Sequence, residues 1–134
     1  MQKLDYKKRD QIIFGSNPPE HYDCKRFTCE KEKIETLVKE GFLDSKEYQN
    51  CSPTTQDFLD YTEGFEDYGI ETKFTCYVIE PERDDTRVTI EGVNFIVPET
   101  AYDQVAYIVE VFHDADVFTM EHAWSSYYIH TWWD

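Results

Sequence analysis

The chain has 134 residues, a formal net charge of −15 at pH 7, and ten tyrosines, nine phenylalanines and three tryptophans. This length predicts one domain spanning residues 1–134, and so many aromatic side chains argue against an intrinsically disordered chain. No stretch approaches the roughly 20 apolar residues of a membrane-spanning helix, and the N-terminus lacks a signal-peptide core, so we expect a cytoplasmic protein that does not bind membranes.

The negative charge is concentrated in the C-terminal part of the chain. Residues 1–48 hold ten Lys/Arg and ten Asp/Glu, whereas residues 49–134 hold three Lys/Arg and eighteen Asp/Glu. A surface built from the second part repels phosphate and attracts basic groups. We therefore expect no direct binding to DNA or RNA, and we expect partners with basic surfaces.

The N-terminal part, about residues 1–69, is predicted to be helical. Residues 4–14 predict a short helix that ends at Gly15, and two prolines predict a loop after it. Residues 28–41 predict a second helix, with Thr28 as its N-cap and Gly41 at its end. A third helix is predicted from Ser52 to Gly69, because Ser52 precedes a proline that suits the first helical position.

The C-terminal part, about residues 70–134, is predicted to be rich in strands, because the hydrophobic period changes there from about 3.6 to 2. Residues 71–80 predict a central strand. Residues 87–98 predict either two short strands around Glu91-Gly92 or one long strand with a bulge at the glycine. A helix is predicted over residues 100–113, with Tyr102, Val105, Ala106, Val109 and Phe112 on its inner face, and a hairpin is predicted over residues 116–134.

The last strand has two rows of large side chains, which point to opposite faces. One row is Tyr127, Ile129, Thr131 and Trp133, and the other is Tyr128, His130 and Trp132. If helices cover only one face of the sheet, one of these rows stays partly exposed. We predict an α+β fold with a mostly antiparallel sheet of about four to five strands, in which the N-terminal helices and one helix between strands pack on one face.

No catalytic motif stands out, and no cofactor is expected. Cys24 and Cys29 have a spacing compatible with a zinc knuckle, with His21 nearby, but there is no second close pair, and free thiols are the better interpretation. A Glu/His/Asp cluster between residues 110 and 122 is the alternative metal site, although a solvated helix end also explains it. Its candidate ligands are Glu110, His113, Asp114, Asp116 and His122.

The strongest functional signal is the acidic segment 57–71, which contains six carboxylates and no Lys or Arg. Carboxylates at intervals on a rigid surface can make the same charge-assisted bonds to Arg and Lys as phosphates do. The hypothesis is a small acidic protein that binds a partner protein with a basic surface. In a narrower version, it mimics nucleic acid and occupies the binding surface of a nucleic-acid-binding enzyme, as phage or mobile-element inhibitors do. The alternatives are a metal-dependent enzyme that uses the 110–122 cluster, and a structural subunit that self-associates, for example as a homodimer. The predicted contact residues are Asp57, Asp60, Glu63, Glu66, Asp67, Glu71, Trp132 and Trp133.

Overall fold

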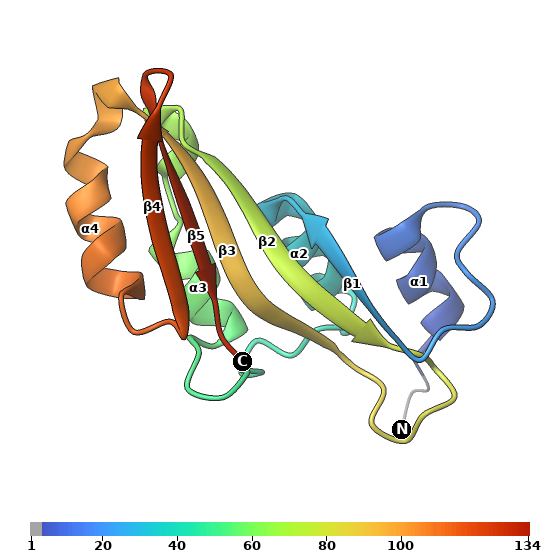
Figure 1. Cartoon of the computed structure of the whole chain (residues 1–134). Coiled ribbons are helices and arrows are strands. Elements are labelled where there is room, and N and C mark those ends of the chain that lie inside the picture. Colours follow the sequence, from blue (N-terminus) through green and yellow to red (C-terminus); the bar gives the residue numbers. More distant parts are fainter. Residues whose placement is uncertain (1–3) are drawn as a thin grey trace.

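The computed structural model describes residues 4–134 and arranges them as a layer of helices against an antiparallel sheet (Figure 1). The fold is therefore α+β, as predicted. In chain order, the elements are α1 (Tyr6–Phe14), β1 (Cys24–Cys29), α2 (Lys31–Lys39), α3 (Thr55–Tyr61), the 3-10 helix η1 (Phe65–Tyr68), β2 (Glu71–Ile79), β3 (Val88–Pro98), the 3-10 helix η2 (Glu99–Ala101), α4 (Asp103–Phe112), β4 (Val117–Ala123) and β5 (Ser126–Trp132).

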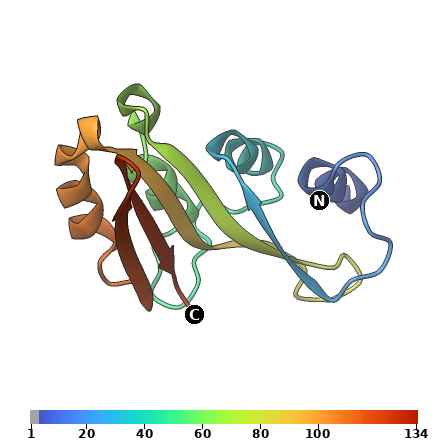
Figure 2. The ribbon, with the colours of Figure 1, turned by 45° about the horizontal axis from the view of Figure 1, so that its top comes forward.

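The five strands are ordered β1-β2-β3-β5-β4, and every neighbouring pair is antiparallel. All four α-helices lie on the same side of this sheet, which leaves its other face without helices (Figure 2). None of the helices within residues 4–134 is long and apolar enough to cross a membrane.

Two predicted helix starts were wrong. Thr28 lies in β1, and α2 begins after Glu30, whose backbone is extended. Similarly, α3 begins after Thr54 rather than Ser52, because the Thr54 hydroxyl accepts a hydrogen bond from the Asp57 amide while the Asp57 carboxylate accepts one from the Thr54 amide. The helix predicted up to Gly69 is interrupted by Gly64 at φ +80°, which separates α3 from η1.

Strand β1 was not predicted from the sequence. It is an edge strand that pairs with β2, with Arg26 opposite Tyr77 and Cys29 opposite Phe74. Most of its side chains are exposed, so the local sequence shows no apolar row. The strand forms because β2 offers unpaired backbone groups along its edge.

Of the two predictions for residues 87–98, one long strand with a bulge is correct. The register between β2 and β3 shifts between Thr75 and Cys76, which face Gly92 and Ile90, so Glu91 is the extra residue. At the bulge β3 lies so close to β5 that a Cβ on Gly92 would overlap the Thr131 carbonyl oxygen. Glycine is therefore required at this point of the sheet.

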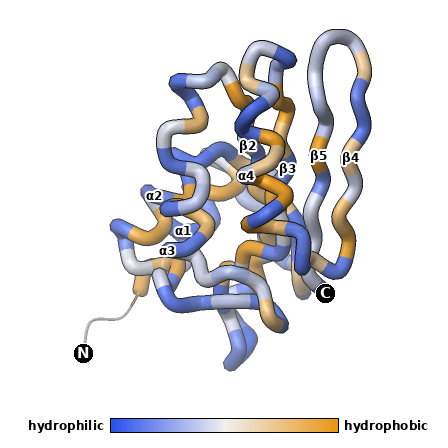
Figure 3. The backbone as a smooth tube through the Cα atoms, turned by 90° about the vertical axis from the view of Figure 1, so that its left-hand side faces the viewer, coloured by the Kyte–Doolittle hydropathy of each residue, from blue (hydrophilic) through white to orange (hydrophobic). Residues whose placement is uncertain are grey.

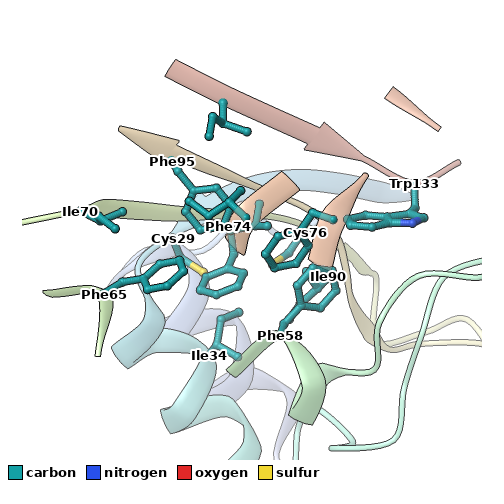
Figure 4. Packing of buried hydrophobic residues seen from close by; sticks show 14 of the residues in the cluster. Cys29, Ile34, Phe58, Phe65, Ile70, Phe74, Cys76, Ile90, Phe95 and Trp133 are labelled. Atoms are coloured by element: carbon teal, nitrogen blue, oxygen red, sulfur yellow. The ribbon is translucent and has the colours of Figure 1, made fainter. Parts of the chain in front are cut away.

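The core lies between the sheet and the helices, where hydrophobic stretches of both layers face each other (Figure 3), and aromatic rings dominate it (Figure 4). The Phe58 ring is 5.5 Å from Trp133, 6.1 Å from Phe74 and 6.2 Å from Phe112, measured between centroids. Helix α4 contributes Val105, Ile108 and Phe112, and the prediction that Tyr102 and Ala106 face inward was wrong because both are exposed.

The two rows on β5 are confirmed. Ile129, Thr131 and Trp133 are buried against the helices, whereas Tyr128 and His130 are exposed on the other face. Trp133 is only 1% exposed, so its prediction as a contact residue for a partner is corrected: it is part of the core.

Candidate functional site: the acidic face

Five carboxylates that follow one another along the chain are all exposed, and we call this set the acidic face. It consists of Asp60 on α3, Glu63 in the following turn, Glu66 and Asp67 on η1, and Glu71 at the start of β2; all five residues are exposed. The segment is held in place by Phe58 and Phe65, which are buried beneath it. The carboxylates therefore sit on an ordered scaffold.

Asp57 differs from the other predicted acids of this segment. It is half-buried, and its carboxylate accepts the Thr54 amide at 3.4 Å in the capping box of α3. Its contacts therefore identify it as a helix cap, and it is not counted in the acidic face.

The charges of the acidic face have no cation partner within residues 4–134, where none of the five carboxylates forms an ion pair with Lys, Arg or His. Asp60 accepts only the side-chain amide of Gln56, at 2.9 Å. By contrast, every arginine of the chain is paired with a carboxylate elsewhere. The pairs are Arg9–Asp10, Arg26–Glu91, Arg83 with Asp23 and Asp85, and Arg87 with Glu47 and Asp85.

A small pocket of about 170 Å³ opens beside the acidic face, between the start of α2, η1 and the start of β2. Phe65 and Ile70, both buried, give it an apolar lining, and Glu66 and Glu71 of the acidic face line it as well. Glu30, Glu32, Lys31, Thr62 and Thr72 complete the lining. The Lys31 ammonium donates to the Leu59 carbonyl oxygen at 3.1 Å, and the Thr72 hydroxyl is buried without a hydrogen-bond partner within residues 4–134.

Helix α4 lies next to the acidic face. The Tyr107 hydroxyl donates to the Tyr61 carbonyl oxygen at 3.2 Å, and the Tyr107 ring contacts Phe65 at 6.0 Å between centroids. Burial raises the pKa of Tyr107, and the negative charge of Glu110 adds to the effect. Glu110, one turn further along α4, is also exposed.

The predicted metal ligands do not converge. The His113 ring nitrogen contacts the Glu110 carbonyl oxygen at 2.9 Å on its own helix, Asp116 accepts the Asp134 amide at 2.7 Å, and His122 contacts Glu99 at 2.7 Å. Asp114 is exposed. Among residues 4–134 no group of three His, Cys, Asp or Glu side chains is placed to hold a metal ion.

Cys24 and Cys29 likewise do not form a zinc knuckle. They lie at opposite ends of β1, and an odd separation along a strand directs side chains to opposite faces. Accordingly, Cys24 is exposed and lines a pocket with Arg26 and Trp132, whereas Cys29 is buried in the core.

The structure also separates Trp132 from the acidic face. Trp132 is half-buried on the sheet face that carries no helices, where its indole donates to the Glu91 carboxylate at 3.2 Å. Glu91 is almost fully buried and also accepts the Arg26 guanidinium at 2.7 Å. These side chains line a pocket of about 280 Å³, together with Cys24, Gln49, Tyr77 and Asp134. In the sequence, the sign of this pocket was a single charged residue, Glu91, next to Gly92 within an otherwise apolar strand.

Comparison with protein-family models, with curated proteins and with solved structures gave no match.

Proposed function

We propose that the protein acts by binding a partner protein with a basic surface through its acidic face. The observation that carries the proposal is the row of five exposed carboxylates that have no cation partner within residues 4–134. Unpaired carboxylates on an ordered scaffold attract Lys and Arg from a distance and accept charge-assisted hydrogen bonds on contact.

The pocket beside Glu66 and Glu71 gives this surface a specific acceptor. The aliphatic stem of a Lys or Arg side chain suits its lining of Phe65 and Ile70, while the cationic head reaches the carboxylates. A partner that inserts one basic side chain here and pairs others with Glu63 and Asp67 would bind in a single orientation. In the narrower form of the proposal, the partner is a nucleic-acid-binding enzyme whose basic groove accepts these carboxylates in place of phosphates.

The test compares two variants that lose the same charge at different places. The variant E63Q/E66Q/D67N neutralises the acidic face, and the control E20Q/E82Q/D84N neutralises two Glu and one Asp that are exposed in other segments. Each immobilised full-length chain is used to capture proteins from a cell lysate, with elution by rising salt and a parallel elution with duplex DNA.

The proposal predicts a basic protein that the wild type and the control retain and that the acidic-face variant does not. Loss of three exposed charge contacts, at about 0.2–1 kcal/mol each, lowers affinity roughly threefold to a hundredfold. Displacement of the captured protein by DNA supports the narrower form. Equal retention by both variants, or capture of nothing, contradicts the proposal.

A further inference from the structure

Two of the four cysteines lie side by side in the core. Cys29 on β1 faces Phe74 of β2, and Cys76 of β2 faces Phe27 of β1, so the two cysteines are diagonal neighbours across the strand pair. Both side chains point to the helix-covered side of the sheet (Figure 4). The other two cysteines, Cys24 and Cys51, are exposed.

The two thiols of the pair differ in access. Cys29 lines an open pocket of about 400 Å³, whose other walls include Lys33 and Lys73. Cys76 does not line this pocket and is fully buried behind it. A small molecule that enters the pocket therefore meets Cys29 first.

The surroundings also shift the pKa values of the two thiols in opposite directions. The neighbouring Cys76 thiol lowers the pKa of Cys29 below its ordinary value, and Lys33 and Lys73 add to this effect against burial and Glu30. Burial raises the pKa of Cys76, and the neighbouring Cys29 thiol raises it further. Of the two thiols, Cys29 therefore loses its proton more readily than Cys76.

We propose that Cys29 and Cys76 form a reactive thiol pair, in which Cys29 reduces a small hydroperoxide in the Lys33–Lys73 pocket and Cys76 then closes a disulfide between β1 and β2. The Cys29 thiolate attacks one peroxide oxygen, which forms an S–O bond and breaks the O–O bond; the leaving oxygen takes up a proton as water or an alcohol. The Cys76 sulfur then attacks the Cys29 sulfur, the S–O bond breaks, and hydroxide leaves with the Cys76 proton as water. The peroxide gains two electrons, one from each sulfur.

The position of β1 favours the second step. Diagonal neighbours across two strands lie about 7–8 Å apart, beyond the roughly 4.4–6.8 Å between Cα atoms that a disulfide spans, so one strand has to shift before the bond can close. Strand β1 is at the edge of the sheet and is hydrogen bonded to β2 only, so it can move without breaking a second strand pairing.

The first experiment uses the full chain with its exposed cysteines removed, C24S/C51S, so that only the pair can react. The folded protein is treated with hydrogen peroxide, then denatured and alkylated, and its mass and peptides are measured. We expect a loss of two hydrogen atoms, no alkylation, and a peptide that joins Cys29 to Cys76. If both thiols still alkylate after peroxide treatment, the proposal is wrong.

Two further variants test the order of the steps and the role of the pocket. In C24S/C51S/C76A the reaction should stop at a Cys29 sulfenic acid, which dimedone traps; if the folded variant traps nothing, Cys29 is not the first sulfur to react. In the C24S/C51S background, K73M should slow the reaction about threefold to tenfold by removing a cation beside the thiolate, whereas K46M, an exposed lysine outside the pocket, should not. Equal rates for these two variants contradict the assigned role of the pocket.

Discussion

Arg9 provides a sharp test of how the N-terminal helix is attached. Its side chain is 1% exposed, and its guanidinium donates to the Asp10 carboxylate at 3.0 Å, to the Thr86 hydroxyl at 2.8 Å and to the Ile79 carbonyl oxygen at 2.9 Å. A fourth bond reaches the Tyr22 hydroxyl at 3.3 Å. These contacts join α1 to the end of β2 and to the loop before β3.

Substitution R9M keeps most of the side-chain volume but leaves the buried Asp10 carboxylate without its cation. Removing one partner of a buried ion pair costs about 3–5 kcal/mol, a large part of the roughly 5–15 kcal/mol that stabilises a typical domain. The adjacent K8M is the control, because Lys8 is an exposed residue whose pair with Glu40 lies at the surface, where such pairs contribute about 0–1 kcal/mol. Urea denaturation followed by circular dichroism gives both values.

The double variant R9M/D10N separates the lost contacts from the unpaired charge. Because asparagine removes the charge, we expect the double variant to recover a substantial part of the loss and to lie about 1–2 kcal/mol below wild type. Hydrogen exchange of the α1 amides shows whether the helix detaches before the rest unfolds. A loss of less than about 1 kcal/mol for R9M, or no recovery in the double variant, would refute the reasoning.

Three other outcomes follow from backbone and burial. Substitution G92A should lower the free energy of unfolding by about 1–3 kcal/mol or more, because the new Cβ overlaps the Thr131 carbonyl oxygen and forces β3 away from β5; an unchanged melting temperature contradicts this. Substitution W124N/S125G should raise the melting temperature by about 3–5 °C, because both turn residues have positive φ (54° and 70°), which Asn-Gly adopts with less strain; a lower melting temperature would show that the Trp124 side chain stabilises the turn. Burial and, next, the hydrogen bond to Asp10 raise the pKa of Tyr22 from 10.0 to about 12. The raised pKa therefore adds stability that is present below pH 10 and is lost as the pH rises towards 12. Between pH 9 and pH 11 the free energy of unfolding should decrease less for Y22F, which has no phenol to ionise, than for wild type. An equal decrease for both proteins would contradict this prediction.

The division of side chains between the two sheet faces was readable from the sequence. A strand directs successive residues to opposite sides, so the alternation around Phe74 and around Ile129 identified the rows that share a face. Helix ends at Gly15 and Gly41 were equally readable, because a positive φ is a local requirement that glycine meets.

The acidic face was also readable in large part, because Glu63, Glu66 and Asp67 are close along the chain and too polar to be buried without partners. The exception is Asp57, which the sequence did not distinguish from its neighbours. Asp57 closes the capping box only because Thr54 is the N-cap of α3. The local sequence allows either Ser52 or Thr54 as the N-cap, and the rest of the fold determines which of them it is.

Tertiary structure alone decided which row is covered and which distant residues meet. Trp132 and Trp133 are equivalent in the sequence, yet the helices bury one and leave the other on the opposite face beside Glu91. The pair Arg26–Glu91 joins residues 65 positions apart, and β1 itself exists only because β2 presents an edge to it. Local sequence determines backbone preference and side-chain alternation, whereas these contacts depend on where the whole chain brings its separate segments together.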